Sequence, residues 1–289
     1  MADYLAAHAG DGLTVPIMLA VLGAAVLHAL WNSIAHVISD RLVGFGLIGL
    51  ANSVGGGAIA VFTGLPAPDA WPFLVASAVI HVAYNLALMA SYRLGEFSQT
   101  YPIARGTSPW VVALASIYLL HRPLGLNQLL GVLTISVGLI GLVLAGGRLR
   151  VRQLPAIGAA VLTGLLIATY TVIDGLGVAA TPVMGYIGWL FLLEGVPLAL
   201  LAVLRRGREL GEPLRRYGWL GLLGGFISLA AYGIVLWAQT SGALAPIAAL
   251  RESSIVFGAL IGALFLGERL GARRSIAAAV VLVGIVLLA

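Results

Sequence analysis

Two similar stretches of sequence indicate the fold: YPIARGTSPWVVALASIYLLHRPLG at residues 101–125 and IAALRESSIVFGALIGALFLGERLG at residues 247–271. Arg105 corresponds to Arg251 at an offset of 146 residues, which is close to half of the 289 residues of the chain. The same offset relates four further pairs: Ser108 and Ser254, Leu124 and Leu270, Gly125 and Gly271, and Gly138 and Gly284. The sequence therefore predicts a chain of two similar halves.

The composition is that of a protein embedded in a lipid bilayer. Hydrophobic residues make up 61% of the chain and charged residues only 9%, and the mean hydropathy is +1.05. Soluble domains carry about 25% charged residues, so a water-covered surface cannot be built from this chain. Because a bilayer leaves no water for the backbone, runs of about 20 apolar residues cross it as helices. The sequence thus predicts an all-α integral membrane protein.

Reading the apolar runs between breaks gives ten predicted spans. They lie at residues 14–37, 41–63, 70–92, 97–120, 126–146, 154–173, 182–204, 217–239, 243–266 and 273–288. Five spans per half is an odd number, so the second half enters the bilayer inverted relative to the first, as in many secondary transporters. We expect two inverted five-helix repeats, 14–146 and 154–288, and no connection long enough to hold an extramembrane domain.

The residue types exclude several function classes. All 16 basic residues are Arg, so a phosphate-binding lysine and a lysine Schiff base are absent. The chain has no Cys, which excludes disulfides, thiolate metal sites and cysteine nucleophiles. The net charge of +5 comes from loop arginines and does not indicate a nucleic-acid partner. We expect no cofactor and no metal.

The loop charges predict an orientation. Connections 1–2, 3–4, 5–6, 7–8 and 9–10 together hold thirteen arginines, whereas the opposite side holds Arg122 alone. By the positive-inside rule the arginine-rich side faces the cytoplasm, which puts both termini outside the plasma (inner) membrane. The thirteen are Arg41, Arg93, Arg148, Arg150, Arg152, Arg205, Arg206, Arg208, Arg215, Arg216, Arg269, Arg273 and Arg274.

Four motifs resemble the EamA-like branch of the drug/metabolite transporter superfamily: HALWN (28–32), YPIARG (101–106), ALRESS (249–254) and LFLGERL (264–270). The resemblance covers nearly the whole chain and implies a ten-helix secondary transporter made of two EamA-type repeats. Two features depart from it. His121-Arg122 stands where the second half has the family-like Gly267-Glu268, and many family members are expected to keep their termini in the cytoplasm.

Arg105 and Arg251 are the strongest candidates for a binding site. Each lies about eight residues into its span, or roughly 12 Å into a hydrocarbon core about 30 Å thick. A guanidinium at that depth costs about 2.5–3.5 kcal/mol on insertion scales and persists where it faces a cavity or a partner. One reading is a clamp on an anionic or carboxylate-bearing substrate. The alternative is structural ion pairing with Glu194 and Glu252, which are also candidates for proton coupling.

Polar and aromatic side chains on several apolar helices complete the candidate substrate site. Because lipid does not solvate them, they are expected to converge on one cavity, although any single one could simply bond a neighbouring helix. Tyr170 and Asp174 belong to the same polar stripes. The substrate-binding candidates besides the two arginines are His28, Trp31, Asn32, His81, Tyr84, Asn85, Tyr101, Ser108 and Tyr232.

These features favour a secondary active transporter that moves a small polar metabolite by alternating access. The metabolite would carry a carboxylate, a zwitterion or another anionic group. Two alternatives are an intramembrane lipid-phosphate-processing enzyme and a facilitative channel. The enzyme would need a nucleophile or base beside a phosphate cradle, and no paired acidic motif accompanies Arg105 and Ser108. The expected partners are the small-molecule substrate and the lipid bilayer, with a proton or an exchanged solute as the driving species.

Overall fold

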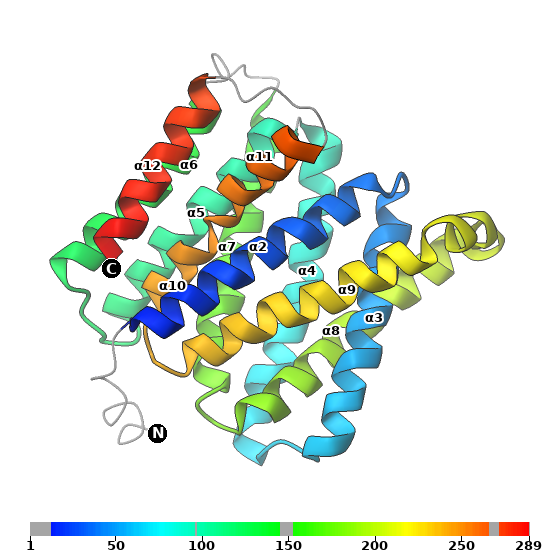
Figure 1. Ribbon diagram of the computed structural model, residues 1–289. Coiled ribbons are helices and arrows are strands. Elements are labelled where there is room, and N and C mark those ends of the chain that lie inside the picture. The colour runs from blue at the N-terminus through cyan, green and yellow to red at the C-terminus, as the bar shows by residue number, and fades with distance from the viewer. Residues whose placement is uncertain (1–12, 96, 145–152, 266–271, 289) are drawn as a thin grey trace.

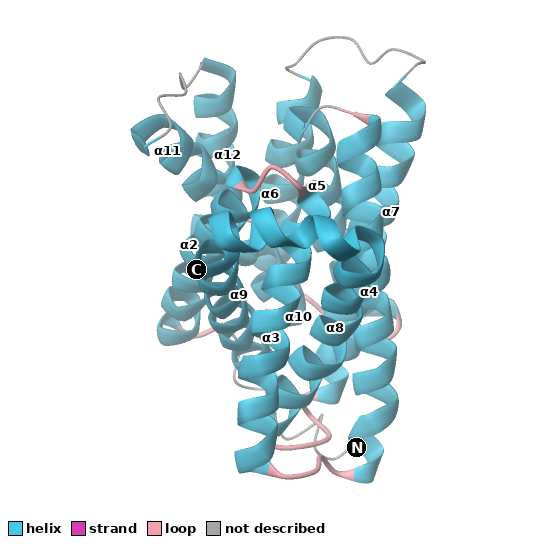
Figure 2. Ribbon diagram, turned by 90° about the vertical axis from the view of Figure 1, so that its right-hand side faces the viewer, coloured by secondary structure: helices cyan, strands magenta, loops and turns pink. Residues whose placement is uncertain are grey.

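The computed structural model describes residues 13–95, 97–144, 153–265 and 272–288, and within these ranges all regular structure is helical (Figures 1 and 2). Two short 3-10 turns, η1 (Pro68–Ala70) and η3 (Gly207–Leu210), join longer helices. The α-helices are α2 (Val15–Val37), α3 (Arg41–Thr63), α4 (Trp71–Leu94), α5 (Phe97–Tyr118), α6 (Leu126–Leu144), α7 (Leu154–Gly177), α8 (Val183–Arg206), α9 (Gly211–Gln239), α10 (Leu244–Arg251), α11 (Ser254–Phe265) and α12 (Ala272–Leu288).

Five helical stretches among the described residues are long and apolar enough to cross a membrane. They are Val15–Ala35, Arg41–Thr63, Pro68–Leu94, Leu154–Gly177 and Val183–Gln239, the last of which includes both α8 and α9. Residues 126–141 and 275–288 form shorter apolar helices. The ends of two predicted spans (145–146 and 266) and the Arg148, Arg150, Arg152 and Arg269 positions lie outside the described residues.

The predicted ninth span, 243–266, is not one helix. It is divided into α10 and α11 at Glu252 and Ser253. The amides of Glu252 and Ser253 bond three residues back, to Ala249 and Leu250, and the amide of Ile255 bonds to the carbonyl of Glu252. The chain therefore leaves the α-helical register next to Arg251, in the middle of an apolar run.

Several pairs of helices lie with their backbones in direct contact, and two of these contacts join glycines of both helices. In α3 and α8, a Cβ added to Gly49 would lie 2.8 Å from the Gly195 carbonyl oxygen, and one added to Gly56 would lie 2.7 Å from that of Gly188. We call this contact the α3–α8 glycine seam. In α6 and α12, a Cβ on Gly131 would lie 2.9 Å from the Gly284 carbonyl oxygen. Small residues permit this close approach in membrane helices.

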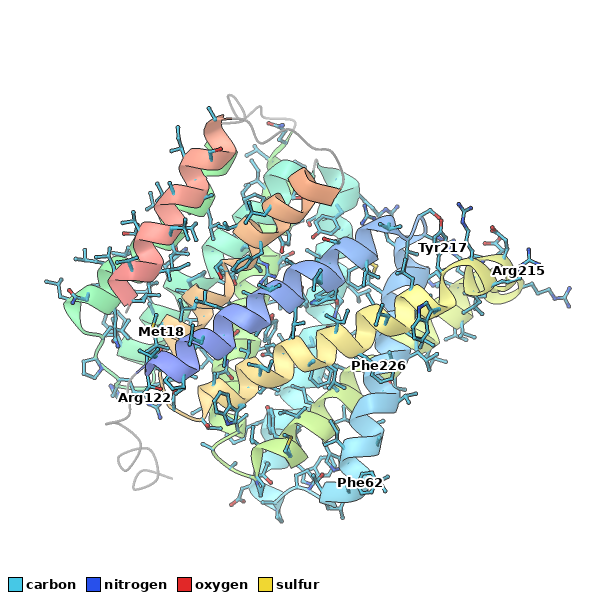
Figure 3. All side chains as sticks on the ribbon, in the orientation of Figure 1. Met18, Phe62, Arg122, Arg215, Tyr217 and Phe226 are labelled. Atoms are coloured by element: carbon cyan, nitrogen blue, oxygen red, sulfur yellow. The ribbon has the colours of Figure 1, made fainter. Side chains whose placement is uncertain are left out.

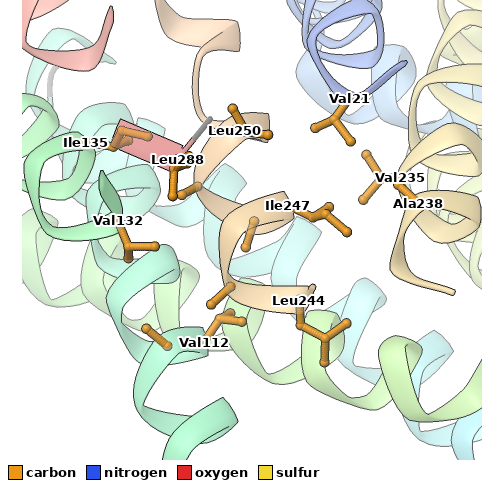
Figure 4. Close-up of a cluster of buried hydrophobic side chains, with 14 of the residues drawn as sticks. Val21, Val112, Val132, Ile135, Val235, Ala238, Leu244, Ile247, Leu250 and Leu288 are labelled. Carbon is orange, nitrogen blue, oxygen red and sulfur yellow. The ribbon is translucent and has the colours of Figure 1, made fainter. Parts of the chain in front are cut away.

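The largest apolar cluster surrounds α10, whose eight residues are all buried. In Figure 4, Val112 and Val132 lie on one side of α10 and Val21 and Val235 on the other. The cluster therefore joins α2, α5, α6, α7, α9 and α12 around the divided helix. A second cluster, centred on Tyr186 and Leu190 of α8, packs α4 against α8 and α9.

The outer surface of the bundle is apolar. Phe62 is 90% exposed and Phe226 is 46% exposed, and both lie on the outside of the bundle (Figure 3). A water-soluble monomer rarely exposes extensive apolar surface, whereas lipid tails solvate it. The surface thus suits a bilayer.

Contacts between connections show which helix ends lie together. At one end the Arg206 side chain forms an ion pair with Asp40 at 2.7 Å. At the other end Arg122 donates to the Gly242 carbonyl at 2.8 Å, and the Ala67 amide donates to the Thr181 hydroxyl at 3.3 Å. Figure 3 shows Arg215 and Arg122 at opposite ends of the molecule. Successive connections therefore alternate between two ends.

Candidate functional site

Two arginines and one glutamate meet in the interior of the bundle. Arg105 of α5 donates from Nη1 to Oε1 of Glu252 at 3.2 Å. Arg251 places its Nη2 3.6 Å from the same oxygen. Arg105 and Arg251 are 3% and 2% exposed, and Glu252 is fully buried. The predicted pairing of an arginine with Glu252 is thus present, and the two guanidiniums share one carboxylate.

The local backbone explains how the two arginines reach this point. Arg105 lies between Pro102 and Pro109 within α5. Pro109 has no amide hydrogen, so the Arg105 carbonyl loses its usual donor one turn ahead. Arg251 ends α10, where the break diverts the Ile255 amide to Glu252. Both arginines therefore lie where the helical hydrogen-bond ladder is interrupted.

Aromatic rings and a histidine surround Arg105. Its Nη2 contacts Nε2 of His28 and the hydroxyl of Tyr101, the latter at 3.3 Å. The guanidinium also lies 5.3 Å from the Tyr101 ring centre. Trp31 donates from its indole nitrogen to Nδ1 of His28 at 3.1 Å. These contacts hold Arg105 among groups from α2 and α5.

Arg251 lies between two tyrosine rings. Its guanidinium carbon is 5.8 Å from the Tyr170 ring centre and 5.9 Å from that of Tyr232, within the range of cation–π contacts. The Nε and Nη2 atoms of Arg251 have no hydrogen-bond partner among the described residues. This guanidinium thus has hydrogen-bonding capacity that the protein does not use.

A second polar cluster lies across the tyrosine rings from the arginines. His81 of α4 stacks on Tyr170 at 3.9 Å between ring centres, and its Nε2 lies 3.7 Å from Oε2 of Glu194. The Asn52 amide of α3 donates to Oε1 of Glu194 at 3.3 Å. Glu194 therefore contacts a histidine and an amide. The ion pair between Glu194 and an arginine, which the sequence analysis offered as an alternative, is not formed among the described residues.

Asp174 is a third buried carboxylate. It accepts a hydrogen bond from Tyr186 at 2.8 Å and another from Tyr232 at 2.6 Å, one on each oxygen. Tyr232 therefore links Asp174 to Arg251. Both carboxylate oxygens of Asp174 are satisfied, in contrast to those of Glu194 and Glu252.

Comparison with known proteins identifies part of the chain. Residues 154–289 match the family model described as the EamA-like transporter family. The C-terminal half of the chain is an EamA-like transporter domain. A comparison with curated proteins gave no match. A solved structure entitled "Crystal structure of protein" has a TM-score of 0.74 and 19% identity, covering 94% of this chain and 97% of that chain. This likeness establishes a shared fold over nearly the whole length.

The EamA-like domain contributes only part of the site. It contains Arg251 and Glu252, together with Glu194, Tyr170, Asp174 and Tyr232. His28, Asn52, His81, Tyr101 and Arg105 lie in the N-terminal half, outside the matched residues. The polar interior is thus shared between the EamA-like domain and the half that precedes it. The family match and the long apolar helices together identify a multi-pass membrane protein.

The remaining candidates lie at the edge of the two clusters. Tyr84 contacts the rings of His81 and Tyr170. Asn32 and Asn85 donate to carbonyls of their own helices, those of His28 and His81, each at 2.8 Å. The Ser108 hydroxyl is buried without a hydrogen-bond partner among the described residues. The structure therefore brings the histidines, tyrosines and arginines together and leaves the two asparagines with local partners.

Four residues of the clusters were not among the sequence-based site candidates: Asn52, Tyr170, Asp174 and Tyr186. Tyr170 and Asp174 were visible as members of a polar stripe. Asn52 is an amide in an apolar segment that the sequence analysis did not single out. It could have been found by applying to α3 the rule that polar groups within spans seek partners.

Proposed function

We propose that this protein is a secondary active transporter for a small polar metabolite bearing a carboxylate or another anionic group, alone or as a zwitterion. Membership of the C-terminal half in the EamA-like family supports a transport role. The observation that carries the substrate class is the meeting of Arg105 and Arg251 on the single carboxylate of Glu252.

Charge counting supports an anionic ligand. Two guanidiniums and one carboxylate leave this cluster with one excess positive charge. An uncompensated charge is costly in a low-dielectric interior. An anion that bonds to Nε and Nη2 of Arg251 would supply both the missing charge and the missing acceptors. In this proposal Glu252 is the resident counter-ion with which the substrate competes.

Several contacts support two inverted repeats of five spans, 14–146 and 154–288. Gly49 and Gly195 touch in the α3–α8 glycine seam and are separated by 146 residues, the offset that relates Arg105 to Arg251. In the two repeats α2 corresponds to α7 and α4 corresponds to α9. Accordingly, α4 packs on α7 and α9 packs on α2. Movement of one half against the other would give alternating access.

The alternating helix ends support the orientation proposed from the loop arginines. The end that carries Asp40, Arg206 and Arg215 would face the cytoplasm, and the end that carries Arg122 would face outward. Both chain termini would then lie outside the plasma membrane.

Thermal unfolding of the purified protein with panels of anionic, zwitterionic, neutral and cationic metabolites tests the substrate class. A ligand at 100 times its dissociation constant that binds only the folded state adds about 2.7 kcal/mol of stability. We expect anionic or zwitterionic compounds to raise the melting temperature of the parent. The shift should be lost in Arg105→Gln and Arg251→Gln and kept in Arg215→Gln, which alters an exposed arginine.

The proposal is wrong if folded Arg105→Gln and Arg251→Gln proteins bind the same compounds as the parent. It is equally wrong if only cationic compounds stabilise the parent. Transport of the stabilising compounds into proteoliposomes, driven by a solute or pH gradient, then separates a transporter from a protein that merely binds them.

A further inference from the structure

We propose that His81 and Glu194 together form a site for a single exchangeable proton, distinct from the arginine cluster. The existence of this site does not depend on the substrate. Its role as the site of the coupling ion rests on the proposed transport function. The argument starts from the hydrogen on the histidine ring.

The position of that hydrogen follows from the contacts of Nδ1. This atom lies 3.0 Å from the backbone carbonyl oxygen of Ser77 and 3.1 Å from the Ser77 hydroxyl. A carbonyl oxygen only accepts hydrogen bonds, so Nδ1 carries a hydrogen. In the neutral ring the other nitrogen, Nε2, then bears a lone pair.

This lone pair faces a carboxylate. Nε2 lies 3.7 Å from Oε2 of Glu194, beyond hydrogen-bond distance. Oε2 has no hydrogen-bond partner among the described residues, whereas Oε1 accepts from Asn52. Two acceptors facing each other in a buried position repel and leave both unsatisfied. One proton placed between them, on either atom, converts the contact into a charge-assisted or neutral hydrogen bond.

The net charge of the buried ionisable groups also favours one added proton. The buried ionisable side chains of the described residues include two arginines, Arg105 and Arg251, and three carboxylates, Asp174, Glu194 and Glu252. With His81 neutral and every carboxylate ionised, these groups sum to one negative charge. One proton at His81 and Glu194 removes that net negative charge, which otherwise opposes the binding of an anion at the arginine cluster.

The other carboxylate near the pair already has both of its oxygens hydrogen-bonded. Asp174 of α7 accepts from Tyr186 of α8 and Tyr232 of α9. Tyr84 of α4 and Tyr170 of α7 present their rings to His81, and α3 presents the neutral amide of Asn52. Of the two carboxylates in this part of the bundle, Asp174 has both oxygens bonded, whereas Glu194 keeps Oε2 without a hydrogen bond among the described residues. The other unbonded carboxylate oxygen, Oε2 of Glu252, belongs to the arginine cluster.

His28 provides an internal contrast. Its Nδ1 accepts from the Trp31 indole, and its Nε2 faces the guanidinium of Arg105. Both ring nitrogens therefore face donors, and an added proton would lie beside a positive charge. The surroundings of the two interior histidines thus predict opposite behaviour: His81 takes up a proton and His28 does not.

The site also has a physical link to the arginine cluster. His81 stacks on Tyr170, and the guanidinium of Arg251 lies near the same ring at 5.8 Å. A positive charge on the imidazole raises the local potential at Arg251, whereas a proton on Glu194 removes a nearby negative charge. In either form the proton makes the arginine cluster more attractive to an anion, so proton and substrate binding favour each other.

Magnetic resonance of isotope-labelled histidine in the substrate-free protein tests the proton site. The chain has 5 histidines, and ring contacts with Tyr170 identify His81 in the parent protein without any substitution. Between about pH 5 and pH 9, which brackets the ordinary titration of histidine, we expect the His81 signal to change protonation state or hydrogen bonding on Nε2. The His28 signal should remain constant. In Glu194→Gln the new amide can donate to Nε2 permanently, so the transition should be lost.

A constant His81 signal in the folded parent would overturn the proposal, as would an unchanged transition in Glu194→Gln. Because no substrate is present, either result is independent of the substrate class. The coupling role is tested separately in proteoliposomes, where Glu194→Gln should retain solute exchange and lose pH-driven accumulation. Retained pH-driven accumulation would remove the coupling role.

Discussion

Glu252 is the residue on which the interior depends most. It lies at the break between α10 and α11, binds Arg105 from the other half of the chain, and keeps Oε2 without a hydrogen bond among the described residues. The sequence showed that two arginines lie within spans with carboxylates available to them. It did not show which carboxylate each would meet, since contacts between distant helices depend on packing that a single sequence does not specify.

His121 is a residue in an unfavourable backbone conformation. Its φ of 51° is left-handed, and the equivalent position in the second half is Gly267 in the sequence. A side chain in this region costs about 1–2 kcal/mol of folding stability, which glycine avoids. Glycine also makes the unfolded chain more flexible, which lowers the stability by about 0.4–1 kcal/mol and offsets part of that gain. We predict that His121→Gly raises the free energy of unfolding by up to about 1.6 kcal/mol, the first cost less the second.

The measurement for His121 is the denaturant midpoint in detergent, with His121→Ala as control. Alanine retains the Cβ, so it should not reproduce the gain. If alanine stabilises as much as glycine, the histidine side chain and not the backbone conformation is responsible.

At the scale of helices, the length and position of most elements followed from the sequence, because apolar runs between polar breaks determine where a membrane helix can begin and end. The division of 243–266 did not follow. Its apolar pattern continues past Arg251, and the break is made by backbone bonds and by the burial of Glu252 against α5. Local hydrophobicity carries no signal for either cause.

The α3–α8 glycine seam makes a prediction about helix packing. Gly49→Ala would place a Cβ 2.8 Å from the Gly195 carbonyl oxygen, so the helices must separate. We expect a loss of about 1–3 kcal/mol, the usual cost of overpacking. Gly23→Ala is the matched control, because its Cβ would meet nothing within 4 Å and should change stability little or raise it. Equal effects of both substitutions in thermal unfolding would show that the seam is not a tight contact.

Asp40 caps the start of α3, and its ionisation should make the stability of the fold depend on pH. Its side chain accepts from the amides of Leu42 and Val43 at the start of α3 and pairs with Arg206. Burial raises the pKa of Asp40, but the Arg206 guanidinium and the two amides outweigh it and hold the pKa below its usual value. A carboxyl with a lowered pKa stabilises the fold above its unfolded pKa, and this contribution is lost as the pH falls through the native value.

We therefore predict that Asp40→Ala lowers stability at neutral pH by about 0.5–2 kcal/mol, the usual cost of losing a helix cap. The difference from the parent should begin to shrink near pH 4, the usual aspartate value, and be smallest below the lowered native pKa. Asp40→Asn keeps a capping oxygen and loses only the charge, so its effect should be smaller. Melting temperatures across this pH range measure both. A difference that persists undiminished in acid would contradict the role of the charged carboxylate.

For the whole molecule, the absence of cysteine allows the orientation to be measured directly. Asn127→Cys introduces a thiol at an exposed position near Arg122, and Arg215→Cys introduces one at an exposed position at the opposite end. With an impermeant thiol reagent on intact cells, we expect Asn127→Cys to react at once. Arg215→Cys should react only after the membrane is opened. The reverse pattern would show that the arginine-rich end faces outward.

The two ends of the molecule are fastened by different kinds of contact. Asp40 and Arg206 form an ion pair that is partly open to solvent, whereas Arg122 is held by a backbone carbonyl. Mobile ions screen exposed charges over about 8 Å at physiological ionic strength and over shorter distances in concentrated salt. High salt on the arginine-rich side therefore weakens the Asp40–Arg206 ion pair. It leaves the hydrogen bond from Arg122 to the Gly242 carbonyl almost unchanged. In the proposed alternating-access mechanism, ionic strength would therefore change how readily the Asp40–Arg206 end opens, so the salt on each face of a vesicle becomes a variable in the transport assay.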